Sequence, residues 1–160
     1  MKEKNTILII DDNTDTINIL YNAIAEKITT NILCCTDVEN GLRLCLTNTP
    51  DLVIYKTNKK TDQAKRLSKI IKKNNETSNT VFLLICSEDN SDLKCSGVDL
   101  YMKCPVDPTH LVTTVVTLLR LKDLDDLFNR CPKMEDASNI FHLKRMMHDK
   151  LPERIEVLEL

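Results

Sequence analysis

Short apolar runs alternate along the chain with segments whose apolar residues recur every three or four positions. The first run, at 6–10, is apolar after Thr6 and ends in two carboxylates, which predicts a strand buried on both faces of a parallel sheet. Similar runs predict four more strands, at 31–35, 51–56, 80–86 and 98–102.

Helical spacing of apolar residues follows each of the first three runs and the fifth. The first predicted helix follows Asn13, whose side chain can cap the exposed backbone amides. The next two are predicted at 37–47 and 62–73. Asp107 and Pro108 predict the start of the last helix, because aspartate is a favoured N-cap and proline is favoured at the first helical position.

The alternation of strands and helices predicts an α/β fold with a doubly wound, five-stranded parallel sheet, because parallel neighbours require crossover connections. The chain has only two glycines, Gly41 and Gly97, so glycine-rich loops for dinucleotides or phosphates are excluded. A flavodoxin-like strand order, 2-1-3-4-5, is therefore favoured.

The apolar stripe of the last helix continues through Leu121 and Leu124 and should end before Cys131 and Pro132. Apolar positions around Ile140 predict another short helix. We therefore divide the chain into a domain at 1–121 and a C-terminal helical extension at 122–160. The extension could pack on the domain, contact a partner or form a homodimer.

Composition points to a protein partner. A formal charge of -2, from 22 basic and 24 acidic residues, argues against general binding to nucleic acid or membranes. No apolar stretch approaches the roughly 20 residues of a membrane span, and no signal peptide opens the sequence, so a cytoplasmic location is expected. Seven cysteines without a CxxC motif fit reduced thiols better than disulfides or a zinc site.

A lysine-rich segment around the third predicted helix could dock an acidic partner or nucleic acid. A solvated helix face explains it better, because no aromatic residues interleave with the charges. The eight cations are Lys56, Lys59, Lys60, Lys65, Arg66, Lys69, Lys72 and Lys73. The three histidines show no ligand spacing and are expected on the surface: His110, His142 and His148.

Candidate chemistry collects where the predicted strands end, which is where open α/β sheets place their sites. Asp11 and Asp12 follow the first strand, and Lys56 ends the third. Cys86 ends the fourth strand, and Cys104 follows the fifth. We expect these five residues to border one acidic cleft.

Four stretches of the sequence resemble the receiver domain (CheY-like) of bacterial response regulators, over about 7–121. They are 7–13 (ILIIDDN), 50–54 (PDLVI), 97–102 (GVDLYM) and 105–108 (PVDP). The resemblance implies a cytoplasmic protein of two-component, or phosphorelay, signal transduction with a histidine kinase or an output protein as partner. It also implies a bound Mg²⁺, a carboxylate that accepts phosphate, a hydroxyl that senses the phosphate and a lysine that pairs with it.

Only the acidic part of that chemistry matches. Asp11 and Asp12 match the acidic pair and remain possible ligands for Mg²⁺, whereas Lys56 stands at the position of the phosphoacceptor. Cys86 stands at the hydroxyl position and Cys104 at the lysine position, the two switch positions of the family. No catalytic residue is therefore predicted, and the chain is not expected to be an enzyme.

Two nearby residues are not expected to take over the missing roles of the phosphoacceptor and the lysine. Lys103 lies one residue before the expected lysine, so its side chain should point to the other face of the strand. Asp51 precedes Lys56 by five strand residues, on the order of 16 Å, and should lie at the wrong end of the sheet. The turn at 57–64 also lacks the family's Met-Pro and glycine, and the short segment between Cys86 and Gly97 predicts an abbreviated or missing helix.

Lys56 is the basis of the functional hypothesis. Its ammonium could neutralise Asp11 and Asp12 and so replace the metal, or its long stem could simply carry the charge to water. In either case we expect a degenerate pseudo-receiver that binds a protein partner without phosphorylation. The alternatives are a working receiver phosphorylated at an atypical residue, and a thiol redox or metal sensor that uses Cys86 and Cys104.

Overall fold

A five-stranded, wholly parallel sheet forms the centre of the molecule, with the strand order β2-β1-β3-β4-β5. The computed structural model describes residues 5–57, 62–87 and 97–129. The strands are β1 (Thr6–Ile10), β2 (Asn31–Cys35), β3 (Leu52–Thr57), β4 (Val81–Cys86) and β5 (Leu100–Lys103). The predicted flavodoxin-like α/β fold is confirmed.

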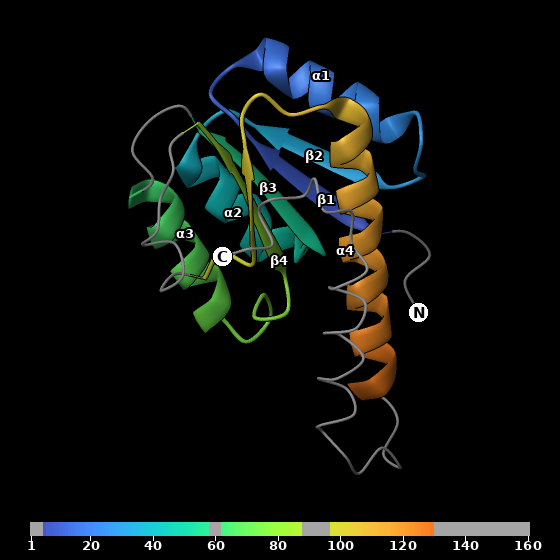
Figure 1. Ribbon diagram of the computed structural model, residues 1–160. Coiled ribbons are helices and arrows are strands. Elements are labelled where there is room, and N and C mark those ends of the chain that lie inside the picture. The colour runs from blue at the N-terminus through green and yellow to red at the C-terminus, as the bar shows by residue number, and fades with distance from the viewer. Residues whose placement is uncertain (1–4, 58–61, 88–96, 130–160) are drawn as a thin grey trace.

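Helices cover both faces of the sheet. They are α1 (Thr14–Ala25), α2 (Val38–Asn48), α3 (Asp62–Lys73) and α4 (Pro108–Asn129). α2 and α3 pack together on one face, and α1 and α4 pack together on the other (Figure 1). The apolar runs of β1, β3 and β4 are buried between these two layers, which is why those strands read as continuous apolar sequence rather than alternating sequence.

Polar residues at the element ends explain why several predicted boundaries were wrong by one or two positions. Asp51 and Thr80, predicted inside strands, precede them: the Asp51 carboxylate accepts a hydrogen bond from Thr6 N, and Thr80 Oγ1 donates to the Pro50 carbonyl. Asp37, predicted inside a helix, is the N-cap of α2. β3 also continues one residue beyond its predicted end, to Thr57. Asn13 caps α1 as expected.

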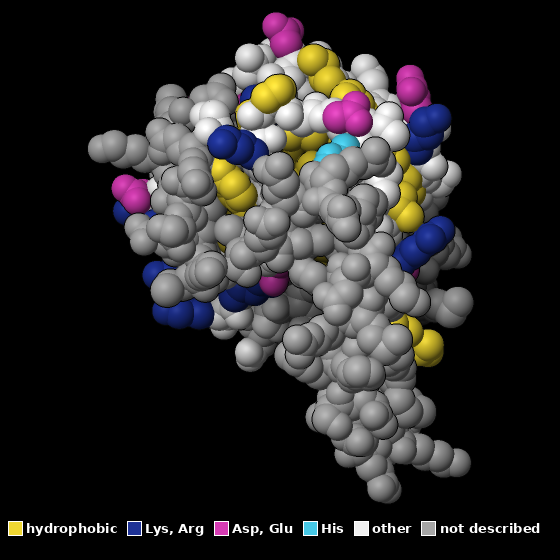
Figure 2. Space-filling view, in the orientation of Figure 1, with side chains coloured by type: hydrophobic (Ala, Val, Ile, Leu, Met, Phe, Trp, Pro, Cys, Tyr) yellow, Lys and Arg dark blue, Asp and Glu magenta, His cyan; other side chains and the backbone are white. Residues whose placement is uncertain are grey.

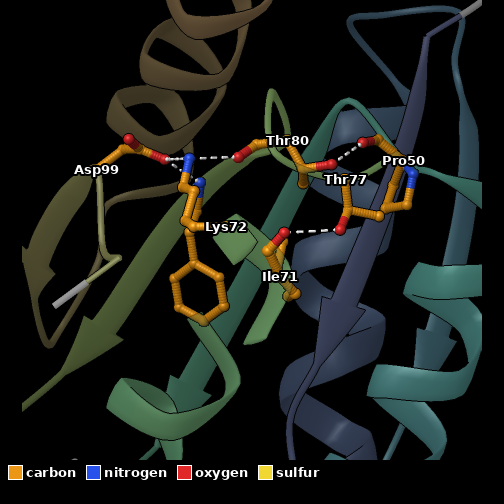
Figure 3. Close-up of polar contacts among 7 residues, drawn as sticks. Pro50, Ile71, Lys72, Thr77, Thr80 and Asp99 are labelled. Carbon is orange, nitrogen blue, oxygen red and sulfur yellow. Dashed lines mark hydrogen bonds and ion pairs between the residues drawn. The ribbon is translucent and has the colours of Figure 1, made fainter. Parts of the chain in front are cut away.

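The last strand begins at Leu100 instead of residue 98 because Asp99 has another role (Figure 3). Asp99 Oδ2 accepts a hydrogen bond of 2.7 Å from Phe82 N, at the start of β4, and one of 2.6 Å from Lys72 Nζ, on α3. Lys72 Nζ also donates to the Thr80 carbonyl at 2.6 Å. This network fixes the end of α3 at the edge of the sheet where the strands begin, called the amino edge below.

Two cations of the predicted basic surface form ion pairs. Lys72 pairs with Asp99, and Lys56 pairs with Asp11, so neither is simply a solvated charge. Other cations of α3, among them Arg66 and Lys69, are exposed. Lys and Arg side chains gather over α3 in Figure 2. A solvated helix face remains our interpretation of this part of the surface.

The last helix continues past residue 121 without interruption, as the apolar stripe predicted, and runs beyond the amino edge (Figure 1). Lys122 Nζ lies 3.5 Å from Asp51 Oδ1, and only 11% of the Lys122 side chain and 1% of the Asp51 side chain are exposed. The start of the predicted extension is thus attached to the sheet. The division at 121/122 stays a prediction.

Some expectations fall outside the described residues. These are the short helix around Ile140, the histidines at 142 and 148, the end of the last helix at Cys131, most of the turn at 57–64 and the abbreviated helix between Cys86 and Gly97. Within the described ranges, no helix combines the length and the apolar character that crossing a bilayer would require.

Candidate functional site

The carboxyl edge of the sheet, where the strands end, brings the predicted site residues together. Asp11 follows β1, and its backbone N–H donates to the Cys35 carbonyl at the end of β2. Lys56, next to last in β3, places its Nζ 3.7 Å from Asp11 Oδ2. The backbone N–H of Cys104 donates to the Cys86 carbonyl, which joins the ends of β4 and β5.

Asp11 is the most constrained carboxylate of this edge. Its side chain is 2% exposed, and Oδ1 accepts a hydrogen bond of 3.0 Å from Asn13 N. Oδ2 has no hydrogen-bond partner, because Lys56 forms an ion pair at a distance too long for a hydrogen bond. Burial raises the pKa of Asp11, opposed by the Asn13 hydrogen bond and then by the charge of Lys56. Contact with Asp12 raises the pKa further.

An open cleft lies beside this ion pair. Its volume is about 470 Å³, and it extends from the ends of β1 and β3 to the first residues of α2 and α3. Asp12, which is exposed, stands at its border. Among the described residues, the lining is formed by Ile10, Asp11, Asp12, Thr36, Asp37, Val38, Glu39, Asn40, Tyr55, Lys56, Thr57 and Gln63.

The expectation that Cys86 and Cys104 border the same cleft was wrong, because neither cysteine lines it, and the two differ in burial. Cys86 is 1% exposed, and its Sγ donates a hydrogen bond to the Tyr101 hydroxyl at 3.5 Å. Cys104 is half-buried; burial raises the pKa of its thiol, and the charge of Lys56 lowers it by less. Neither thiol forms a disulfide bond. The raised pKa of Cys104 leaves little thiolate on this residue at neutral pH, which weakens the case for Cys104 as a reactive thiol.

Three other residues lie away from this cluster. The Lys103 side chain is exposed at the end of β5. Asp51 lies at the amino edge, bound to Thr6 and Lys122, so it cannot serve the carboxyl edge. The expectation of a surface location for His110 was wrong, because the residue is half-buried and its Nε2 is buried without a hydrogen-bond partner.

Sequence reasoning missed the far wall of the cleft, formed by Asp37, Glu39 and Asn40, and also Tyr55 and Gln63. The rule that located Asp11 could have found the first two, because Asp37 and Glu39 lie at the start of α2, shortly after β2 ends at Cys35, and carboxyl ends of parallel strands share an edge. No feature of the sequence predicted that Gln63 would line the cleft. Its side chain meets the Tyr55 hydroxyl only through the folded position of α3.

The donor set does not fit a dedicated Mg²⁺ site. Asp11 Oδ2 accepts no hydrogen bond, but it is buried and paired with Lys56, and Asp12 stands beside it. However, no three His, Cys, Asp or Glu side chains lie close enough to hold a metal ion, as far as the described ranges show. Lys56 already places a positive charge at Asp11. A divalent cation here would have to displace or repel that ammonium.

Comparison with solved structures shows which fold this arrangement belongs to. A CheY-like response regulator receiver domain protein from Methanospirillum hungatei is 15% identical, with a TM-score of 0.69 over 77% of this chain and 99% of its own. The chemotaxis response regulator CheY4 of Vibrio cholerae is 15% identical, with a TM-score of 0.64 over 72% of this chain and 98% of its own. The chain has the receiver fold. A response regulator protein from Burkholderia multivorans is 25% identical, with a TM-score of 0.61 over 72% of this chain and 94% of its own.

No family model and no curated protein matches the sequence. The likeness is therefore one of fold, and it spans nearly the whole of each receiver protein compared. The receiver fold covers about three quarters of this chain.

Proposed function

We propose that this protein is a receiver-type component of two-component signal transduction that binds its partner without being phosphorylated. The observation that carries the proposal is the ion pair between Lys56 Nζ and Asp11 Oδ2, at 3.7 Å on the carboxyl edge of a receiver fold. In this reading Lys56 stands where the phosphoacceptor carboxylate would be, and Cys86 and Cys104 stand at the switch positions.

The chemistry of the edge supports this reading. Phosphoryl transfer to a receiver needs a carboxylate nucleophile, and a lysine held as an ion pair has no lone pair with which to attack phosphorus. It also needs a cation to screen the incoming phosphate, yet the carboxylates present do not form a metal cluster among the described residues. A fixed positive charge at Lys56 would keep the acidic residues in one arrangement, so the partner would recognise a permanent surface.

The proposed partner is a protein, either a histidine kinase or an output protein, and the proposed role is binding, not catalysis. Association through residues 122–160 stays a second, independent expectation, as does a cytoplasmic location. A thiol sensor built from Cys86 and Cys104 gains less support, because the pKa of Cys104 is raised and Cys86 is buried.

Phosphorylation is the decisive test. The full chain is incubated with acetyl phosphate and Mg²⁺, and incorporated phosphate is measured by intact mass, before and after treatment with hydroxylamine, which cleaves acyl phosphates. We expect no labile phosphate. A matched variant, Lys56→Asp combined with Cys104→Lys, restores the phosphoacceptor and the lysine of the family, leaves Cys86 at the hydroxyl position, and serves as the positive control. Stoichiometric, hydroxylamine-labile phosphate on the unaltered chain would refute the proposal in favour of a working receiver with an atypical acceptor.

A further inference from the structure

The last described part of α4 extends beyond the sheet. Lys122 is paired with Asp51 at the amino edge, and residues 123–129 follow, about 10 Å of helix at 1.5 Å per residue (Figure 1). These residues are called the overhang below. They lie past the edge where the strands begin, so the sheet does not cover them.

The overhang nevertheless keeps an apolar face. Leu118, over the sheet, is 8% exposed, whereas Leu127 is 64% exposed, more than any other large apolar side chain in the described part of the chain. Leu124, about one helical turn earlier, is half-buried. Helices in proteins owe most of their stability to the packing of such a face. Leu127 is therefore available for an apolar contact.

The charges of the overhang favour a basic partner. Asp123 is exposed and precedes Leu127 by four positions, so the two side chains share one side of the helix. By sequence the overhang carries three aspartates, and the last turn of α4 contains no basic residue. Carboxylates are unfavourable near the C-terminal end of a helix, where the macrodipole is negative. A cation beside Asp123 would offset this repulsion.

One segment of this chain has the complementary pattern. Residues 139–150 lie outside the described ranges, and their sequence predicts a short helix that should end before Pro152. Lys144 should flank the apolar stripe of this helix. With three basic residues and one acidic residue, the segment is opposite in charge to the overhang. Its apolar stripe consists of Ile140, Leu143 and Met147.

The connection between the overhang and this segment is long enough for one chain to make the contact. Residues 130–138 could span roughly 30 Å if extended, and packed helices need only about 8–10 Å between their axes. Pro132 interrupts the helical pattern early in this connection, which favours a turn. A short covalent connection gives the segment an effective concentration in the millimolar range, above that of a second molecule in dilute solution.

We propose that residues 139–150 pack antiparallel on the overhang of the same chain, with their apolar stripe against Leu124 and Leu127 and with Lys144 close to Asp123. The overhang is then an internal contact of the C-terminal extension, and the expected association through the extension would use residues 151–160. The inference does not rest on the proposed function. It concerns the amino edge, whereas the acetyl phosphate test concerns the carboxyl edge, so either can fail alone.

Methyl NMR of the full chain tests the contact directly. With ¹³C-labelled methyl groups of Ile, Leu and Met, we expect nuclear Overhauser effects between Leu127 and Leu143 or Met147. A mixture of labelled and unlabelled chains, recorded with an isotope filter, should show no such effect between chains. Contacts only between chains would assign the overhang to a second copy. That result, or the absence of any contact between Leu127 and 139–150, would overturn the inference.

Hydrogen exchange of the full chain, followed by mass spectrometry, adds variants with matched controls. Leu127→Glu places a charge in the proposed apolar contact and should lower the protection of the amides of 139–150 at least about tenfold. Leu46→Glu makes the same change on α2, on the other face of the sheet, and should leave this protection unchanged. Lys144→Glu should lower it about two- to fivefold, and Arg154→Glu, beyond the segment, should not. Exchange of 139–150 at the rate of an unstructured chain, or equal effects of a variant and its control, would refute the packing.

Discussion

Replacing Lys56 with methionine tests the ion pair on which the proposed function depends. Methionine keeps an unbranched side chain but removes the charge 3.7 Å from Asp11 Oδ2. With Asp11 2% and Lys56 15% exposed, the pair lies between an exposed pair, worth roughly 0–1 kcal/mol, and a buried pair, whose disruption costs about 3–5 kcal/mol. We expect the free energy of unfolding to fall by about 2 kcal/mol near neutral pH.

The loss of unfolding free energy caused by Lys56→Met should depend on pH, because the pKa of Asp11 is raised, mainly by burial. A carboxyl with a raised pKa in the folded state stabilises the fold fully below its ordinary value of 3.8, and this contribution is lost as the pH rises through the folded value. Without Lys56 the folded pKa should rise further. The destabilisation by Lys56→Met should therefore be small at about pH 4 and grow toward about pH 7.

Urea unfolding followed by far-ultraviolet circular dichroism, at both pH values, measures this difference. For a domain of this size, 2 kcal/mol corresponds to a midpoint shift of about 1 M urea. Lys73→Met, at an exposed position at the end of α3, is the matched control and should change stability by less than about 0.5 kcal/mol. An equal loss at both pH values, or no loss at neutral pH, would show that Lys56 does not stabilise the ionised Asp11.

Two further predictions concern the amino edge and a close contact. Asp51→Asn and Lys122→Met should each destabilise the protein by about 2 kcal/mol, and their double variant by about 1 kcal/mol less than the sum; additive effects in urea unfolding would contradict a coupled pair. Gly97→Ala should cost about 1–3 kcal/mol, because its Cβ would lie 2.6 Å from the backbone oxygen of Ser68, which cannot move aside as a side chain can; an unchanged melting temperature would contradict this.

The sheet could be predicted from sequence because its signal is local. Runs such as 81–86 are apolar throughout, as expected for a central strand covered by helices on both faces, and the alternation of strands with helices indicates parallel neighbours joined by crossovers. The strand ends were harder to predict. Asp51 and Thr80 are adjacent to the apolar runs in sequence, but in the structure each lies just before the strand and makes a side-chain hydrogen bond there.

The candidate site was predictable to the extent that it lies at strand ends. Asp11 and Lys56 end neighbouring strands of the predicted order, so their proximity followed from topology. Contacts between residues far apart in sequence had no such basis. The hydrogen bond between Lys72 and Asp99, 27 positions apart, and the burial of His110 Nε2 depend on how helices pack after the sheet has formed.

The 22-residue helix α4 connects two distant parts of the molecule. At 1.5 Å per residue it is about 33 Å long, starting at the carboxyl edge and passing the amino edge, where Lys122 holds it to Asp51. The chain therefore leaves this helix on the opposite side of the molecule from the acidic cleft. The cleft and the last described turn of α4 therefore lie on opposite sides of the domain, so substitutions at one of these places should leave the other unchanged.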